Sequence, residues 1–343
     1  MQMTKNIFQE VTIMLDLSVQ YLGLKLKNPI VVSSSPLGEN MEKIQSLERE
    51  GASAVVLPSF FEEQATQTEF SHSLLYEEDG YSKYLDYYFD VLKNKLTPEK
   101  YMKFITEVKS KIDIPIIGSL NGVSVGGWIN NAISMEEAGA DAIELNIYFL
   151  PTDPGMNGQK VEKNYLELVD KITGSVAIPV AVKIHPYLSS IPHMVKSLTD
   201  AGAGAVVLFN RFYQPEINLE KMTVEPTLKL STSEELLHRI RWTAILFGNT
   251  NADIAITGGV HTVEDVIKSV TAGANVTMLA SLLLDKGINY LGSLIKDIEK
   301  WLETHKYQSI KQIHGIMSQK SVSEPALFER ANYLRVIDSY HQK

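Results

Sequence analysis

The sequence predicts an α/β fold of one domain, a (β/α)8 barrel in which eight parallel strands close into a ring with helices between them. The first observation is a tetrapeptide of small residues built on Gly and Ala, which occurs four times, each time directly before a short apolar run. A glycine there ends the preceding helix in the left-handed conformation and lets the helix end lie close to a strand. The four copies occupy residues 51–54, 138–141, 201–204 and 272–275.

The second observation is a further series of four apolar runs that alternate with the first. These runs are opened by Pro29, Pro115, Pro179 and Asp253. Together the two series give eight apolar runs in chain order, and such continuous runs are typical of strands that are buried on both faces of a parallel sheet. Eight such strands with helices between them predict a closed barrel.

The third observation is the size of the chain. A length of 343 residues is ordinary for one barrel with insertions. The composition, with 44% hydrophobic and 21% charged residues, is typical of a globular protein with a large core. We therefore expect one domain over residues 1–343, with the barrel proper at about 29–303. The long connections 60–98 and 213–231 are expected to be lids or subunit contacts. The tail 304–343 has no predicted place.

The individual elements follow from local patterns. Residues 16–28 alternate apolar and polar side chains and predict a hairpin at the bottom of the barrel. The expected strands are 29–34, 54–59, 115–120, 142–148, 179–184, 205–210, 253–257 and 276–281. Amphipathic spacing predicts the helices 41–50, 98–111, 128–139, 162–174, 191–201, 233–248, 262–272 and 288–303.

The composition excludes several classes of protein. The absence of Cys excludes disulfides, thiolate metal sites, cysteine nucleophiles and an iron–sulfur cluster held by this chain. A net charge of −9 argues against nucleic-acid binding through a phosphate-tracking surface. The chain has no apolar run long enough to span a membrane and no secretory signal in residues 1–18, and no His and carboxylate cluster has metal-ligand spacing. These features predict a cytoplasmic protein that acts on a small molecule.

The active site of such a barrel lies where the strands end. Nearly every apolar run closes on a group that forms hydrogen bonds, and the residues at these ends are Ser33, Ser34, Ser35, Ser59, Ser119, Asn121, Asn146, Tyr148, Lys183, His185, Asn210, Arg211, Thr257, Gly258, Gly259, Ala280 and Ser281. Gly258 and Gly259 follow the seventh strand, where backbone amides commonly bind phosphate, and Ser281 adds a hydroxyl. Lys183 would neutralise an electron-rich flavin or an anionic substrate, or would form a Schiff base.

Five segments, in this order, resemble the dihydroorotate dehydrogenase family, in particular its soluble class 1 enzymes and their looser relatives. The resemblance runs from about residue 17 to residue 318. The segment from Asn28 to Ser35 resembles the NP…ASG motif of the first strand, and Glu144-Leu-Asn-Ile resembles ELNLS of the fourth. The remaining segments resemble VK-x-x-PY, TGGI and the C-terminal signature, at residues 182–187, 257–260 and 307–315.

The resemblance implies that the barrel binds FMN. Ser33 and Ser34 would line the isoalloxazine, with Ser59 and Asn146 near it. Lys183 would lie on the N1 side of the flavin, where negative charge develops on reduction. The phosphate would be held by Gly258, Gly259, Ala280 and Ser281. The substrate would contact Asn146 and Asn210, and the class 1 enzymes imply a homodimer.

This chain departs from the family around the substrate. The lysine that follows the second strand in the family is Pro58 here, and the family's NPR and MGLN segments are not recognisable in residues 60–90. The Cys or Ser that serves as base is absent from residues 146–151. Tyr148 is the nearest candidate base by position, although the phenol pKa of ~10 suits that role poorly.

Three interpretations therefore remain open. The chain is an FMN oxidoreductase that acts on dihydroorotate or on another small cyclic substrate, with Lys183 beside the flavin. Alternatively, it is a lyase or isomerase in which Lys183 forms a Schiff base. The third interpretation is a flavin-binding barrel without catalytic activity.

Overall fold

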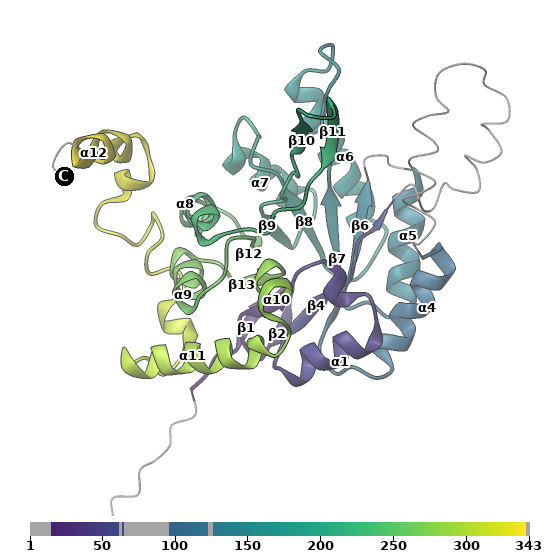
Figure 1. Cartoon of the computed structure of the whole chain (residues 1–343), viewed down its shortest axis with the longest axis horizontal. Helices are drawn as coiled ribbons and strands as arrows, with labels where there is room; N and C mark the ends of the chain where they lie inside the picture. The colour runs from purple at the N-terminus through teal and green to yellow at the C-terminus, as the bar shows by residue number, and fades with distance from the viewer. Residues whose placement is uncertain (1–14, 62–63, 65–95, 123–125, 341–343) are drawn as a thin grey trace, which may run out of the picture.

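Eight parallel strands close a barrel in the computed structural model, which describes residues 15–61, 64, 96–122 and 126–340 (Figure 1). Each strand pairs with its neighbour in chain order, and pairing of β13 with β3 completes the ring. The predicted (β/α)8 barrel is thereby confirmed. Its strands are β3 (Ile30–Val32), β4 (Ala54–Val56), β6 (Ile116–Gly122), β7 (Ala142–Ile147), β8 (Val180–Ile184), β9 (Ala205–Leu208), β12 (Asp253–Thr257) and β13 (Val276–Leu279).

Helices surround the barrel and connect its strands. Glycines that follow four of them, Gly51, Gly139, Gly202 and Gly273, have φ values of +100°, +96°, +96° and +119°. These are the left-handed angles expected of the repeated small-residue tetrapeptide. The helices are α1 (Met41–Arg49), α4 (Pro98–Lys109), α5 (Gly126–Glu137), α6 (Gly158–Thr173), α7 (Ile191–Asp200), α8 (Leu236–Leu246), α9 (Val263–Ala272), α10 (Ser281–Lys286) and α11 (Tyr290–Thr304).

The ends of some elements differ from the prediction. Helix α6 begins four residues earlier than expected, at Gly158 rather than 162, because the Asn157 side chain accepts a hydrogen bond from the Lys160 amide at 2.9 Å and caps the helix. The expected strand 54–59 is shorter in the structure, since β4 ends at Val56, and a separate short strand β5 (Phe60–Phe61) follows it and pairs with β6. The expected helix 233–248 begins with a 3-10 turn, η3 (Ser233–Glu235).

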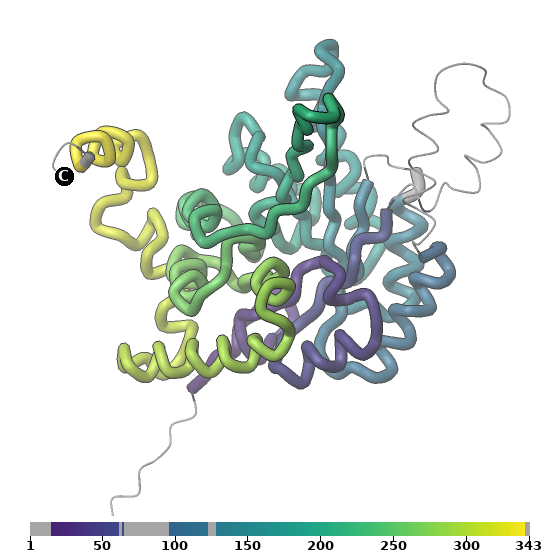
Figure 2. The backbone as a smooth tube through the Cα atoms, viewed as in Figure 1, coloured from purple at the N-terminus to yellow at the C-terminus, as the bar shows by residue number. Residues whose placement is uncertain are grey.

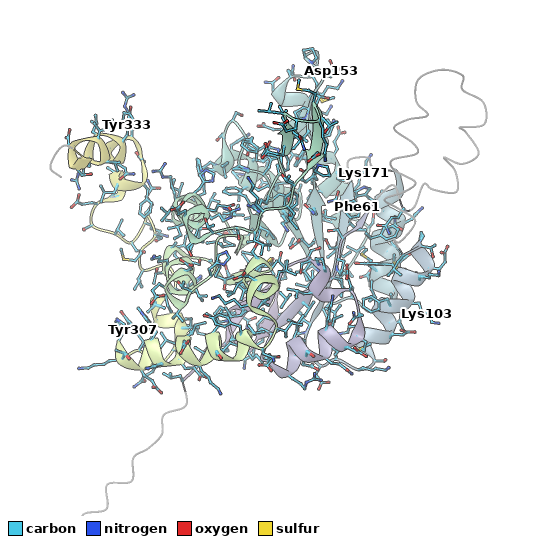
Figure 3. All side chains as sticks on the ribbon, viewed as in Figure 1. Phe61, Lys103, Asp153, Lys171, Tyr307 and Tyr333 are labelled. Carbon is cyan, nitrogen blue, oxygen red and sulfur yellow. The ribbon has the colours of Figure 1, made fainter. Side chains whose placement is uncertain are left out.

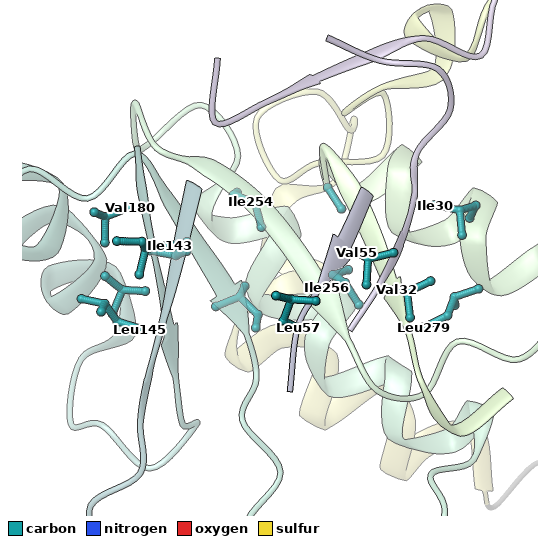
Figure 4. Packing of buried hydrophobic residues seen from close by; sticks show 14 of the residues in the cluster. Ile30, Val32, Val55, Leu57, Ile143, Leu145, Val180, Ile254, Ile256 and Leu279 are labelled. Carbon is teal, nitrogen blue, oxygen red and sulfur yellow. The ribbon is translucent and has the colours of Figure 1, made fainter. Parts of the chain in front are cut away.

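Most of the apolar core lies between the barrel and its helices. Along each strand, residues that face the helices alternate with residues that face the lumen. On β7, Ile143 and Leu145 face the helices, and Figure 4 shows several such outward-facing residues together. This alternation is what a strand covered on both faces requires. Residues in the lumen form a separate cluster, which includes Val31, Val207 and Met278.

The bottom of the lumen is filled by the predicted N-terminal hairpin. Its strands are β1 (Val19–Tyr21) and β2 (Leu24–Leu26), and the Leu22 amide donates to the Asp253 carboxylate at 2.8 Å, at the start of β12. Tyr21 is fully buried in the lumen cluster. Small side chains on the barrel strands make room for its ring, and these are Ala54, Ala142, Ala181, Ala205 and Ala255.

The second long connection forms an antiparallel hairpin after β9, made of β10 (Pro215–Asn218) and β11 (Thr223–Pro226). Residues 65–95 of the first connection lie outside the described residues, so its expected role as a lid or subunit contact stays a prediction. The tail contains η4 (Ile310–Ile313), η5 (Pro325–Phe328) and α12 (Arg330–Tyr340). Helix α12 stands away from the barrel, as the yellow end of the tube in Figure 2 shows.

Candidate active site

The carboxyl ends of the strands gather most of the predicted site residues at one end of the barrel. The β10–β11 hairpin and the loop that contains Asp153 rise above this end, whereas Tyr307 lies at the other (Figure 3). Within the part of the chain that the structure describes, no group of three or more His, Asp or Glu side chains is arranged to hold a metal. The strand ends gathered here carry hydroxyl, amide and ammonium groups, together with backbone amides.

A layer of hydroxyl groups covers the upper lumen. The Ser33 hydroxyl, at the end of β3, lies 3.2 Å from the Thr257 hydroxyl at the end of β12. The Ser59 hydroxyl bridges the layer, at 3.2 Å from Ser34 and 2.8 Å from Ser119. Ser33, Ser34 and Ser59, which the sequence predicts as one group, are thus brought together. The layer offers neutral donors and acceptors to a polar ring.

Lys183 lies in this upper lumen as a buried cation. Its Nζ is 3.4 Å from Oε1 of Glu144 on the neighbouring strand β7, and the Lys183 and Glu144 side chains are 9% and 1% exposed. Sequence reasoning did not select Glu144 as a site residue, although a single carboxylate within the apolar run of residues 142–148 was a usable signal. A buried charge of this kind requires a partner, and Glu144 supplies it.

The second oxygen of Glu144 has no hydrogen-bond partner among the described residues, and neither has the hydroxyl of Tyr21 below it in the lumen. Burial raises the pKa of Tyr21 well above its usual range, and the negative charges of Glu144 and Asp253 raise it further. The Tyr21 hydroxyl therefore stays protonated. A column of polar groups thus runs from the hairpin through Glu144 to Lys183.

Two asparagines form a further group beside Lys183. Asn146 is paired in register with Lys183 across β7 and β8. The Asn210 side-chain amide donates to the Asn146 side-chain oxygen at 2.5 Å, and the Asn210 backbone amide donates to the Ile184 carbonyl at 2.7 Å. The two predicted substrate-contacting residues are therefore adjacent. Their remaining amide donors and acceptors suit a ring that carries carbonyl and N–H groups.

The glycine pair after β12 forms a tight turn. Gly258 and Gly259 have φ values of +80° and +82°, which favour glycine. A Cβ on Gly259 would lie 2.5 Å from the backbone nitrogen of Leu236 at the start of α8, so a larger residue does not fit without a shift of backbone. Two features therefore require glycine in this turn: the positive φ angles of both residues and the close packing of Gly259 against Leu236.

Ser231 joins this turn to the end of β13, and sequence reasoning did not select it. Its hydroxyl accepts from the Gly259 amide at 3.1 Å, and its own amide donates to the Ser281 hydroxyl at 3.1 Å. The ring nitrogen Nε2 of His261 is also 3.1 Å from the Ser231 hydroxyl. Ala280 and Ser281 are half-buried beside this network. Amides and hydroxyls converge here as an anion site requires.

An aromatic cluster forms one wall of the mouth. The ring of Phe212 lies 4.2 Å from Tyr148 and 5.3 Å from His185, measured between ring centroids. The His185 Nδ1 accepts a hydrogen bond from the Tyr187 amide at 3.1 Å, and burial lowers the pKa of His185. Burial also raises the pKa of Tyr148. A smaller fraction of Tyr148 is accordingly ionised near neutral pH than of a free phenol.

Arg211 is engaged in an ion pair at the edge of the mouth. Its guanidinium lies 3.0 Å from the Glu235 carboxylate, bonds to the Lys229 carbonyl and lies over the Tyr213 ring. Pro58, where the family has lysine, contributes no cation. Among the described residues at the mouth, the cation that lies within the lumen itself is therefore Lys183.

Comparison with known proteins relates this chain to one family. The family model for dihydroorotate dehydrogenase matches residues 73–302. The catalytic subunit of dihydroorotate dehydrogenase B (NAD(+)) from Thermoplasma acidophilum is 26% identical over 316 residues, which are 88% of this chain and 99% of that protein. The subunits of the same name from Methanosarcina mazei and Pyrococcus abyssi are 28% and 26% identical, over 86% and 88% of this chain and 93% and 98% of their own lengths.

The matched segment begins before α4 and ends within α11. It leaves out β3 and β4 and includes Asn146, Lys183 and the Gly258–Gly259 turn. The described residues contain no helix that is both long and apolar enough to cross a membrane. The barrel, the order of its motifs and the family match lead to one conclusion: this chain belongs to the dihydroorotate dehydrogenase family of oxidoreductases.

Proposed function

We propose that this chain is an FMN-dependent oxidoreductase that oxidises a CH–CH bond of a small cyclic substrate, with dihydroorotate as the substrate typical of the family. The observation that carries the proposal is the position of Lys183. It is a buried cation beneath a layer of hydroxyls, at the same end of the barrel as a glycine turn fit for phosphate. FMN, when bound, supplies the hydride acceptor.

The phosphate end of the site fits this cofactor. Gly258 and Gly259 place no side chain over the backbone of the turn, and the neighbouring hydroxyls of Ser231 and Ser281 already accept hydrogen bonds from backbone amides. A phosphate needs such a set of amide and hydroxyl donors. Ala280 would contribute its backbone, as the family resemblance implies.

The ring end fits as well. Ser33, Ser34 and Ser59 present hydroxyls to the polar edge of an isoalloxazine, and Asn146 presents an amide. The buried hydroxyl of Ser35, in the same segment, has no partner among the described residues, which supports a ligand beside it. Lys183 would hold its ammonium near the flavin position at which negative charge develops, and Glu144 keeps it there.

The substrate would bind between Asn146, Asn210 and the aromatic cluster. The amides would orient its ring by hydrogen bonds, and Tyr148, Phe212 and Tyr187 would exclude water from one side. Tyr148 is the candidate for the proton transfer, and its raised pKa means that it acts poorly as a base near neutral pH. This favours a substrate whose proton is easily lost.

One experiment tests the proposal directly. The purified protein is loaded with FMN and mixed anaerobically with dihydroorotate while the flavin absorption band is followed. Bleaching of the band supports oxidation of dihydroorotate. FMN binding without bleaching supports another cyclic substrate or a flavin-binding barrel without activity, a second candidate favoured by the poor base at Tyr148. Failure to bind FMN contradicts the proposal.

The Schiff-base interpretation is disfavoured by a specific contact. A Schiff base requires Lys183 Nζ to be free to attack a carbonyl, whereas this nitrogen donates a hydrogen bond to the Glu144 carboxylate at 3.4 Å. Borohydride trapping with carbonyl substrates should accordingly leave Lys183 unlabelled.

A further inference from the structure

Arg239 is a buried residue of α8 that lies directly behind the Gly258–Gly259 turn. It is 6% exposed. Its Nε donates to the Thr257 carbonyl at 2.5 Å, and its Nη1 donates to the Glu235 carbonyl at 2.7 Å. Its Nη2 lies 3.0 Å from the position that a Cβ on Gly258 would take. The guanidinium therefore forms the back wall of the turn.

This cation has no carboxylate partner among the described residues: both of its acceptors are backbone carbonyls. The Glu235 carboxylate, whose charge acts on Arg239, is bound by the Arg211 guanidinium through both of its oxygens, at 3.0 and 3.2 Å. Burial lowers the pKa of Arg239, the Glu235 charge offsets part of this change, and Arg211 lowers it further. The positive charge is thus buried and incompletely compensated.

A buried charge without an opposite charge is costly, and an apolar side chain would fill the contact between α8 and β12 at less cost. The position of the charge suggests what compensates it. The Gly258–Gly259 turn, Ser231 and Ser281 lie just in front of it, and their amides and hydroxyls suit an anion.

We propose that Arg239 is the counter-charge for a phosphate monoester bound at Gly258–Gly259, Ser231 and Ser281. It acts from behind the turn, through its electric field and through the Thr257 carbonyl that it holds, rather than by contact with the ligand. The proposal rests on the FMN function proposed above, and it explains why an arginine is buried here. It makes Arg239 a positioning residue that distinguishes phosphorylated from unphosphorylated ligands.

The test compares three ligands: FMN, riboflavin, which lacks the phosphate, and inorganic phosphate. Apoprotein is titrated with each flavin by fluorescence quenching, and inorganic phosphate is tested as a competitor and as a thermal stabiliser. In Arg239→Met, FMN affinity should fall about tenfold or more, while riboflavin affinity should change little. Phosphate stabilisation should be lost. Arg239→Lys should keep most of the preference for FMN because it keeps the charge.

Arg241→Met is the matched control, since Arg241 lies on the same helix but is exposed. It should leave the FMN preference unchanged. Equal weakening of FMN and riboflavin in Arg239→Met would assign Arg239 a purely structural role and overturn the inference, as would unchanged FMN affinity. If Arg239→Met does not fold, Arg239→Gln decides by the same comparison, because it removes the charge but keeps a hydrogen-bond donor: loss of FMN affinity without loss of riboflavin affinity supports the inference, and unchanged FMN affinity overturns it. Wild-type protein that binds neither flavin contradicts the proposed function itself.

Discussion

The Glu144 carboxylate lies 3.4 Å from the Lys183 ammonium, inside the barrel and shielded from solvent. Lys183 projects from β8 and Glu144 from β7, so two adjacent strands hold the opposite charges at a fixed separation. Only Oε1 of Glu144 contacts the Lys183 ammonium. Its Oε2 has no hydrogen-bond partner among the described residues and remains available as an acceptor. The pair is thus rigid while the ammonium still has donors available toward the mouth.

Removal of one partner of this pair should be far more harmful than removal of both. Glu144→Ala leaves the ammonium buried and unpaired, and we expect the free energy of unfolding to fall by about 3–5 kcal/mol. The double variant Glu144→Leu with Lys183→Met should recover much of this loss, yet it should lose flavin affinity because the cation is gone. Urea unfolding and FMN titration measure the two effects. Equal stability of the single and double variants would contradict the prediction.

Replacement of Gly259 should disrupt the Gly258–Gly259 turn more than the positive φ of Gly259 alone explains. Gly287 provides the comparison, because its φ of +84° matches the +82° of Gly259 but nothing lies within 4 Å of its Cβ position. Gly287→Ala should cost about 1–3 kcal/mol of stability, because the ψ of 160° at Gly287 places it in a region adopted essentially by glycine alone, and it should leave FMN binding unchanged. Gly259→Ala should cost more and abolish tight FMN binding. Similar effects of the two variants on FMN affinity would argue against a phosphate role for the turn.

Removal of the Tyr21 hydroxyl should not destabilise the protein. The hydroxyl is buried without a partner among the described residues, so Tyr21→Phe removes an uncompensated polar group and should leave stability equal or higher by about 1 kcal/mol. Tyr21→Ala, in contrast, empties the lumen between the alanines and should cost about 3–5 kcal/mol. Thermal unfolding of the two variants checks both. Strong destabilisation by Tyr21→Phe would mean that the hydroxyl has an essential partner.

Stability should fall as the pH is lowered below the ordinary histidine range. Burial lowers the pKa of His185, and it also lowers the pKa values of His238 and His314. The unfolded chain therefore binds protons first, and stability is complete above a pH of about 6.5 and declines as the pH approaches the folded values.

His185→Asn isolates the share of one residue. It keeps an acceptor for the Tyr187 amide and removes the titrating ring, so its melting temperature should depend less on pH between about 7.5 and 5.5 than that of the wild type. An unchanged pH profile in this variant would show that His185 is not among the residues responsible.

The barrel could be predicted from sequence because its signals are local. Gly51, Gly139, Gly202 and Gly273 each end a helix within a few residues of the next strand, and their positive φ angles bear this out. The topology then brings all strand ends to one face, so the grouping of Lys183, Asn146 and Asn210 could be anticipated before any contact was known.

The residues that sequence reasoning missed depend on contacts across long separations. Ser231 reaches Ser281, which is 50 positions away, and the Arg239 side chain reaches Thr257 from the outer layer of helices. No local pattern marks either one. Glu144 differs, because its charge was visible within an apolar run, but its Lys183 partner is 39 residues distant.

The hairpin at the bottom of the barrel has a consequence for how ligands bind and leave. Among the described residues, Tyr21 packs with the alanines and closes the lumen below Lys183, so a ligand of Lys183 would enter from the end at which the strands have their carboxyl ends. A bound flavin would therefore occupy the deepest position, and the substrate would have to enter after it and product leave before the next molecule arrives. The closed end of the barrel alone would thus determine that the flavin binds before the substrate.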